Sequence, residues 1–360
     1  VFTNILPNMF ALSCRSLSRC SIQCLRLLYY SSQPKQNYPD DKKISKVINV
    51  AIVGAPNAGK STLINKITER KICAASSKVH TTTKLVRAIC FENDTQIIFL
   101  DTPGVITEKE KNKYKLPDSM LEACVKSLRC ADVIGVVHDV SNKWTRESIH
   151  QDVLNMLELF ETTPSFLVLN KVDTLKSKKQ LLSLIRNLTN GYIAGAPIPN
   201  AKVDSSKVQK GYSKFSDVFI VSAKEGDGVK DIKDYLISNA KVSRLHYSPS
   251  EWSDQTPERL IEEAVRAKFL DFLAQEIPYN LTTQLEFFDD LTDENKITCS
   301  VCVLCPTERL TKLINGSGGG RLHQIKSAVM LDLIEMFKKP VSINIVLKVK
   351  SKSDMENIVA

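Results

Sequence analysis

The segment GAPNAGKST, from Gly54 to Thr62, has the residue types and spacing that hold a phosphate chain. Gly54 and Gly59 allow a tight turn whose backbone amides point at bound phosphate oxygens. Lys60 would contact the β- and γ-phosphates, and the hydroxyl of Ser61 would bind Mg²⁺. The segment therefore predicts a site for a nucleoside triphosphate with its metal ion.

Two later segments, HTTT and DTPG, supply groups for the other side of this site. Asp101 follows an apolar strand and is placed to hold Mg²⁺ from the opposite side, through water. The amide of Gly104 would donate to the γ-phosphate. Thr82 is the threonine expected to close over the metal, with Thr81 and Thr83 as open alternatives.

The segments NKVD and SAKEG carry groups that would read a guanine base. The carboxylate of Asp173 can accept from the ring N–H and the exocyclic amine of guanine together, an arrangement that adenine does not offer. We expect Asn170 to help read the base and Lys171 to lie along its plane, while the Ala223 amide meets the guanine carbonyl oxygen. The predicted nucleotide-binding residues are Gly54, Asn57, Ala58, Gly59, Lys60, Ser61, Thr62, Asp101, Gly104, Asn170, Lys171, Asp173, Ser222, Ala223 and Lys224.

Two residues bear on hydrolysis. Val105 follows DTPG, where Ras-like enzymes carry a glutamine that orients water, so we expect slow intrinsic GTP hydrolysis. Asn57 resembles the asparagine of the TrmE and Era branch of GTPases that holds a K⁺ beside the phosphates; the alternative is a loop asparagine chosen for turn geometry. The predicted catalytic residues are Asn57, Lys60, Thr82 and Gly104, and the predicted metal ligands are Ser61, Thr82 and Asp101.

Alternating apolar strands and amphipathic helices must position these groups. From residue 47 to 245 this pattern predicts an α/β P-loop GTPase domain with a doubly wound, mostly parallel sheet. Residues 189–215 interrupt the pattern with Gly, Pro, Ser and Lys and predict a surface insertion. The expected strands are 47–53, 85–91, 97–100, 133–138, 166–169 and 218–221, and the expected helices are 62–67, 118–130, 147–160, 178–188 and 229–240.

After a Ser- and Pro-rich linker at 246–257, the order of expected helices and strands changes. Residues 258–350 predict helix, strand, strand, helix, a GSGG turn, helix and strand, which is the element order of a type II KH α+β domain. Such a domain lets nucleic-acid backbone approach closely at its GxxG turn. The predicted RNA-binding residues are Gly316, Ser317, Gly318, Gly319, Arg321 and Lys326.

Charge placement supports this reading of the turn. The chain has 49 basic and 40 acidic side chains, yet acidic residues slightly outnumber basic ones from residue 255 onward. Basic side chains nevertheless gather at the turn, which favours a track for a phosphate backbone; a solvated helix face is the alternative. These side chains are Arg309, Lys312, Arg321, His323, Lys326, Lys338 and Lys339.

The ten cysteines show no disulfide framework. Cys299, Cys302 and Cys305 lie in an expected strand, where the alternation of side chains places Cys302 on the opposite face from the other two. We therefore do not expect the three cysteines to bind one metal cluster. No apolar run reaches the length of about 18 residues that spans a bilayer, so we expect no transmembrane segment.

Residues 1–39 contain basic residues among Cys, Ser and Leu, and the first acidic residue is Asp40. This composition predicts a mitochondrial presequence and tail, with a basic disordered tail as the alternative. Free cysteines suit a reducing compartment, so we expect the mitochondrial matrix.

The two-part organisation resembles the Era family of GTPases in its mitochondrial form. The motif PxRLxxEAVRAKxL at Pro257 to Leu270 and EIPY at Glu276 to Tyr279 join the two expected domains, as they do in that family. The resemblance implies binding of small-subunit mitochondrial rRNA near its 3′ end and help in assembling the small mitoribosomal subunit. Ser317 and Gly318 depart from the family, which usually has a basic residue inside the GxxG turn.

Two other classes of function compete with this expectation. One is a GTP-regulated membrane or signalling switch whose C-terminal domain binds a protein partner. The other is a KH-containing RNA factor with a vestigial GTPase domain. For the Era-like protein we expect GTP or GDP with Mg²⁺, and K⁺ if Asn57 holds it, in a monomer with at most peripheral contact with the inner membrane.

Overall fold

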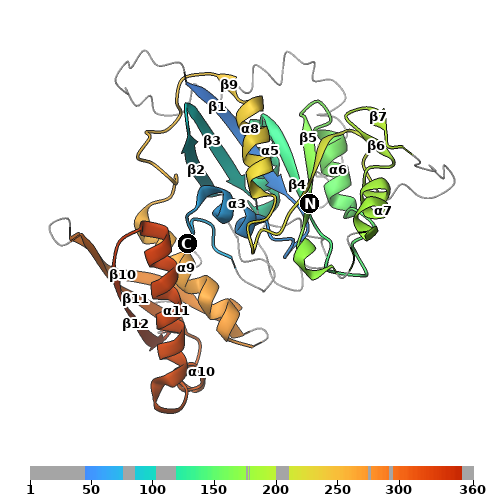
Figure 1. The fold of residues 1–360 in the computed structure, drawn as a ribbon. Helices are drawn as coiled ribbons and strands as arrows, with labels where there is room; N and C mark the ends of the chain where they lie inside the picture. The colour runs from blue at the N-terminus through green and yellow to red at the C-terminus, as the bar shows by residue number, and fades with distance from the viewer. Residues whose placement is uncertain are drawn as a thin grey trace, which may run out of the picture.

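The computed structural model describes residues 45–75, 86–102, 119–175, 177, 179–199, 211–274, 277–291 and 295–350. These residues form two lobes (Figure 1). The first lobe, residues 45–245, is a sheet with helices on both faces, and the second lobe, residues 257–350, is a smaller sheet with helices on one face.

The first lobe is built on a seven-stranded sheet in the order β2-β3-β1-β4-β5-β8, with β9 paired to the start of β1. Strands β3, β1, β4, β5 and β8 are parallel to one another, whereas β2 pairs antiparallel with β3 and β9 pairs antiparallel with β1. The prediction of a doubly wound, mostly parallel sheet is therefore confirmed. Its strands are β1 (Lys46–Val53), β2 (Val86–Glu92), β3 (Thr95–Asp101), β4 (Val133–Asp139), β5 (Ser165–Asn170), β8 (Phe215–Ile220) and β9 (Lys241–Val242).

Strand β1 shows why this sheet is buried on both faces. Ile48, Val50 and Ile52 enter one core, while Ala51 and Val53 enter the other. The alternation follows from the two-residue repeat of a strand, and a nearly continuous apolar run is typical of a central parallel strand.

Helices cover both faces of the sheet (Figure 1). Helices α3 (Lys60–Thr68) and α8 (Val229–Asn239) pack on the face that β1 lines with Ile48, Val50 and Ile52. The other face is covered by α5 (Ser119–Cys130), α6 (Gln151–Leu159) and α7 (Lys179–Leu188).

Two expected boundaries need correction. The helix expected from residue 147 begins at Gln151, because the Asn142 carbonyl accepts from the amides of Thr145 and Arg146 and holds a separate turn. The predicted insertion also ends too late: Tyr212 and Phe215 pack in the core of the first lobe. Its beginning forms a short hairpin of β6 (Tyr192–Ile193) and β7 (Ala196–Pro197).

The second lobe has the element order expected of a type II KH domain. Strand β11 pairs antiparallel with β10 and parallel with β12. On α11, Ile325, Val329, Leu333 and Met336 form a buried stripe that packs on the sheet with α9. The elements are α9 (Pro257–Phe272), β10 (Thr282–Leu291), β11 (Lys296–Cys305), α10 (Glu308–Asn315), α11 (Gly320–Phe337) and β12 (Val341–Val349).

The three cysteines of β11 divide as the alternation predicts. Cys299 and Cys305 belong to the core beneath the helices, whereas Cys302 is buried outside that core. In the part of the chain that the structure describes, no group of three or more His, Cys, Asp or Glu could hold a metal ion.

The linker lies along the edge strand β2. The Ile89 amide donates to the Trp252 carbonyl at 2.9 Å, and the Arg87 amide donates to Asp254 Oδ1 at 2.9 Å. Gln96 of β3 accepts from the His246 amide at 2.8 Å. The linker is thus fixed to the first lobe up to the start of α9. No helix in the described ranges combines the length and apolar character needed to cross a bilayer.

Candidate functional site

Three parallel strands, β1, β3 and β5, deliver their carboxyl ends to one edge of the sheet, and the predicted phosphate loop follows β1. Gly54 has a φ of 154° and Gly59 a φ of 95°. A Cβ on Gly54 would lie 2.3 Å from the Val137 carbonyl oxygen, and one on Gly59 would lie 2.3 Å from Asn170 Nδ2. Both positions therefore require glycine, as predicted from the motif.

Lys60 begins α3 directly after this loop. Its ammonium donates to the carbonyl oxygens of Gly54 at 3.1 Å and Ala55 at 3.0 Å. Burial lowers the pKa of Lys60, although the nearby charge of Asp101 opposes that shift. A buried ammonium held against the loop is suited to an anionic ligand, because an anion would compensate the loss of hydration.

Ser61 and Asp101 lie side by side. The Ser61 hydroxyl donates to Asp101 Oδ2 at 2.9 Å, and Asp101 is fully buried at the end of β3. Thr102 fixes the chain after β3 by donating to the Ile52 carbonyl at 2.7 Å. A hydroxyl and a carboxylate at this separation are the hard oxygen ligands that Mg²⁺ prefers, so the two residues fit the predicted metal.

Cys73 lies next to this pair, a neighbour that the motifs did not indicate. Burial, followed by the charge of Asp101 and a hydrogen bond to it, raises the pKa of the Cys73 thiol. Asn65 of α3 fixes the backbone here, accepting from the Cys73 amide and donating to its carbonyl, both at 2.8 Å. The chain after α3 is therefore fixed to that helix at Cys73.

Asn170 ties two loops together. Its Nδ2 donates to the Ala58 carbonyl at 2.8 Å, and its Oδ1 accepts from the Ala223 amide at 3.0 Å. The side chain thus connects the phosphate loop to the segment SAKEG. Because the Ala223 amide is engaged by Asn170, its expected contact with guanine stays a prediction.

Asp173 is oriented by Ser222, whose hydroxyl donates to Asp173 Oδ1 at 2.7 Å. Lys171 has a left-handed backbone with a φ of 67°, and its ammonium lies 2.6 Å from Asp139 Oδ2. Burial alone would raise the pKa of Asp139, but hydrogen bonds from Lys171 and Ser141 outweigh it and the pKa is lowered. Asp139 was missed by motif reasoning; its place at the end of β4, on the same edge, could have indicated it.

Hydrogen bonds link several described members of the predicted nucleotide site: Ser61 with Asp101, Asn170 with Ala58 and Ala223, and Asp173 with Ser222. Asn57 is exposed and has a φ of 59°, which suits a turn and leaves the K⁺ prediction open. Lys224 is also exposed and lies beside Glu225, with 3.4 Å between their charged atoms. Thr82, Gly104 and Val105 lie outside the described residues.

The GSGG turn joins α10 to α11 at the far end of the second lobe. Gly316 has a φ of 75° and Gly318 a φ of 61°, and a Cβ on Gly318 would meet nothing within 4 Å. The backbone at Gly318 is therefore open to close approach by a ligand. Ser317 is exposed beside it.

The basic side chains near this turn differ in their contacts. Arg321 Nη1 donates to the Leu313 carbonyl at 3.1 Å and so caps the end of α10. Lys312 pairs with Glu308 at 2.9 Å on the exposed surface of α10. Lys326 lies further along α11 and is partly buried.

Comparison with known proteins adds independent evidence. Residues 49–171 match the protein family described as 50S ribosome-binding GTPase. The mitochondrial GTPase Era of Danio rerio is 34% identical over 346 residues, which cover 87% of this chain and 77% of that protein. The protein of the same name from Salmo salar is 33% identical over 359 residues, with coverage of 87% and 78%.

Two solved structures resemble both lobes. A crystal structure of Era in complex with MgGDPNP and nucleotides 1506–1542 of 16S ribosomal RNA has a TM-score of 0.67 and 25% identity, covering 86% of this chain and 95% of that one. An Aquifex aeolicus Era variant bound to GDP·AlF4⁻ has a TM-score of 0.68 and 25% identity, with coverage of 85% and 95%.

Proposed function

Because the chain belongs to the Era family of GTPases, we propose that it binds and slowly hydrolyses GTP and binds small-subunit mitochondrial rRNA near its 3′ end. In this role it assists assembly of the small mitoribosomal subunit in the mitochondrial matrix. The two relatives from fish, both named as mitochondrial, support the mitochondrion as the organelle.

The observation that carries the nucleotide part is the convergence of separate motifs at one edge of the sheet. Asn170 joins the phosphate loop to Ala223, and Ser61 contacts Asp101, so residues far apart in sequence meet around one site. Asp173, oriented by Ser222, is the group that selects guanine.

Ser61 and Asp101 are the described residues that would hold Mg²⁺. The ion would supply positive charge to the β- and γ-phosphate oxygens. Lys60 would bind the same phosphates through its buried ammonium. Val105 offers no group that orients water, so turnover on the order of 10⁻⁴ to 10⁻² s⁻¹ is expected.

The RNA part is supported by the second lobe. The Era structure solved with 16S ribosomal RNA matches this chain over both lobes. In this chain the GSGG turn presents open backbone at Gly318, with Arg321 and Lys326 on the following helix. Close backbone approach with neighbouring basic side chains is how a KH domain grips single-stranded RNA.

The decisive experiment is RNA crosslinking in intact mitochondria that express the tagged full-length chain. We expect crosslinked fragments to concentrate at the 3′ end of the small-subunit rRNA. A Lys326→Ala variant should reduce that signal, and a Lys230→Ala variant, changed on α8 in the first lobe, should retain it. Crosslinks spread over unrelated RNAs, or equal signals from the two variants, would contradict the RNA proposal.

A further inference from the structure

The carboxylate of Asp139, at the end of β4, pairs with the lysine of the NKVD segment at the end of β5. Strands β4 and β5 are neighbours in the sheet (Figure 1). Asp139 Oδ2 lies 2.6 Å from Lys171 Nζ, and the two side chains are 21% and 34% exposed. A partly buried ion pair is screened less by salt and water than an exposed one. The pair is therefore suited to hold Lys171 in one direction.

The second carboxylate oxygen is held as well. Asp139 Oδ1 accepts from the amide of Ser141 at 2.8 Å and from its hydroxyl at 2.5 Å. The carboxylate therefore cannot turn away from Lys171 without losing these hydrogen bonds. In the next residue, the Val140 amide donates to the Asn170 carbonyl at 3.1 Å. The chain after β4 is thus attached to β5 directly before Lys171.

The backbone of Lys171 agrees with a fixed side chain. Its φ of 67° is left-handed, which is uncommon for a residue other than glycine. The Thr174 hydroxyl donates to the Lys171 carbonyl at 2.6 Å and closes the short turn that follows. The Lys171 side chain reaches β4, whereas Asp173 accepts from Ser222, which follows β8, at 2.7 Å. Two residues of one motif thus contact opposite neighbours of β5.

This division of contacts suits the two surfaces of a base. Asp173 is the group expected to read the edge of guanine, which leaves the face of the base for the stem of Lys171. A lysine side chain has many rotamers, so ordering it against a base costs conformational entropy. An ion pair at the far end of the stem meets this cost before the nucleotide binds.

We propose that Asp139 is a positioning residue for the guanine base: it holds the stem of Lys171 along the base plane and so lengthens the residence of GTP and GDP. The proposal rests on the guanine-nucleotide binding proposed above. Asp139 acts through the ammonium of Lys171, so its effect requires that lysine.

A second aspartate of the same strand region provides a matched control. Asp132 immediately precedes β4, at the opposite end of the strand, and its Oδ2 accepts from the amide and the Nδ2 of Asn49, both at 3.0 Å. Its Oδ1 lies 3.4 Å from Lys241 Nζ. The Asp132 side chain is 23% exposed, close to the 21% of Asp139. Asp132→Asn therefore removes a carboxylate of similar burial away from the base-reading end.

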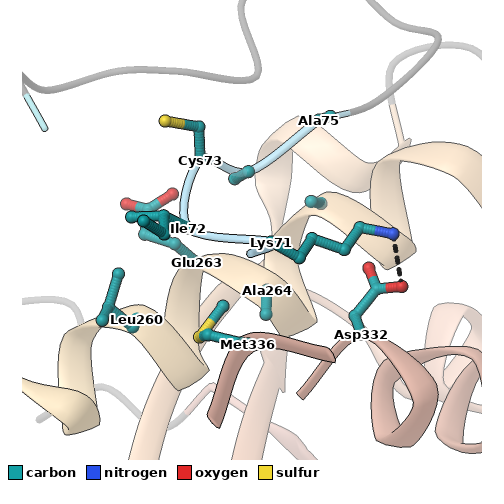
Figure 2. A pocket seen from close by; sticks show the side chains of 11 residues that line it. Lys71, Ile72, Cys73, Ala75, Leu260, Glu263, Ala264, Asp332 and Met336 are labelled. Atoms are coloured by element: carbon teal, nitrogen blue, oxygen red, sulfur yellow. Dashed lines mark hydrogen bonds and ion pairs between the residues drawn. The ribbon is translucent and has the colours of Figure 1, made fainter. Parts of the chain in front are cut away.

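A short ion pair alone does not indicate this role. Asp332 Oδ1 of α11 also lies 2.6 Å from a lysine, Lys71, where residues of both lobes line a small cleft (Figure 2). In the same contact Arg70 Nη1 donates to the Met336 carbonyl at 3.0 Å. That pair joins the two lobes, whereas the partner of Asp139 belongs to the base-reading segment.

The measurement is the dissociation rate of fluorescently labelled GDP from the full-length chain with Mg²⁺, chased by excess unlabelled GDP. Asp139→Asn should speed dissociation by about 5- to 20-fold, as expected when a hydrogen bond between charged groups is lost. Asp132→Asn should stay within twofold of the parent. Asp139→Glu keeps the charge and should recover most of the lost residence time, which also guards against a variant that simply misfolds.

The Lys171→Met variant tests whether Asp139 acts through the lysine. It removes the ammonium and keeps an unbranched stem. In that background Asp139→Asn should add less than twofold, because no ammonium is left to position. A parental rate in Asp139→Asn, equal acceleration by Asp132→Asn, full additivity with Lys171→Met, or an Asp139→Glu variant as fast as Asp139→Asn would each overturn the proposal.

A readout without nucleotide separates failure of this role from failure of nucleotide binding. Hydrogen exchange of the amides at residues 172–174 in the nucleotide-free chain should be faster in Asp139→Asn than in the parent and in Asp132→Asn. If the chain bound no guanine nucleotide but showed this pattern, the positioning of Lys171 by Asp139 would stand and the proposed nucleotide function would fall. Tight GDP binding with a parental rate in Asp139→Asn would have the opposite meaning.

Discussion

Asn170 and Asp173 stand three residues apart in one motif, yet their side chains have different partners. Asn170 uses both ends of its amide to join Ala58 to Ala223, whereas Asp173 receives the Ser222 hydroxyl. Asn170 therefore determines the geometry of the loops. Asp173 keeps carboxylate acceptor capacity for the guanine N–H groups, since a carboxylate offers about four lone-pair sites.

The first prediction at the residue scale concerns base choice. Asp173→Asn should weaken GTP binding by about 100-fold or more, because it removes the acceptor that matches two guanine donors. The same change should improve binding of xanthosine triphosphate, whose extra oxygen can accept from the new amide. Titration of both nucleotides by fluorescence or calorimetry measures the exchange of preference.

Ser222→Ala is the matched control for this change. It removes one hydrogen bond to Asp173 but keeps the carboxylate, so GTP should weaken by only about 3- to 10-fold with no gain for xanthosine triphosphate. Equal GTP affinity in Asp173→Asn and the parent would show that another residue reads the base.

At the scale of elements, the GSGG turn depends on the helix that follows it. A Cβ on Gly316 would lie 3.0 Å from Arg321 Cβ, and Arg321 caps α10 through the Leu313 carbonyl. Arg321 therefore positions the turn through contacts inside the protein chain and not through RNA. Lys326 remains the better candidate for a direct phosphate contact.

Salt dependence should separate these two roles. Lys326→Ala should lower the magnitude of the slope of log affinity against log salt by about 0.7, as expected when one contact to single-stranded phosphate is lost. Arg321→Ala should weaken rRNA binding with an unchanged slope and should also lower the thermal stability of the second lobe. A slope reduced by Arg321→Ala and unaffected by Lys326→Ala would reverse the assignment.

Much of this architecture could be predicted from the sequence, because the spacing of apolar residues and the positions of turn-forming residues indicate the same elements along most of the chain. Strand β11 and helix α11 occur in the predicted order, because β11 alternates apolar residues and α11 carries a helical stripe of Ile325, Val329 and Leu333. The phosphate loop was equally clear, because Gly54 and Gly59 tolerate no side chain.

The remaining features depend on contacts between residues far apart in the sequence, and the spacing of apolar residues does not indicate such contacts. Phe215 follows a polar stretch but packs in the core beside Tyr212, so local composition concealed its burial. Asp139 and Asp332 each acquire a lysine partner only through the fold. The sequence did not indicate that Asn170 links two loops for the same reason, because its partner Ala58 lies 112 residues away.

At the scale of the whole molecule, the linker belongs to both lobes. Trp252 packs against the core formed by α3, α8 and the sheet, and also against the core of the second lobe. Its carbonyl accepts from Ile89 of β2, while its ring contacts Phe337 of α11. Truncating the chain at residue 255 would therefore remove a side chain that the second lobe uses.

The last prediction follows from this shared position. Trp252→Ala should destabilise both lobes, whereas Phe337→Ala, which removes a side chain from the second core alone, should destabilise only the second lobe. Differential scanning calorimetry of the full-length chain with and without GDP and Mg²⁺ identifies the first lobe, because only its transition should rise with nucleotide.

We expect Trp252→Ala to cost about 1 kcal/mol in each lobe, because Trp252 is only partly buried. It should lower the nucleotide-sensitive transition by about 2 to 4 °C and the smaller lobe's transition by about 4 to 8 °C. In Phe337→Ala the nucleotide-sensitive transition should stay in place. If Trp252→Ala also left that transition in place, the linker would belong energetically to the second lobe alone, and the contact between the lobes would depend on Arg70, Lys71 and Asp332 without support from the tryptophan.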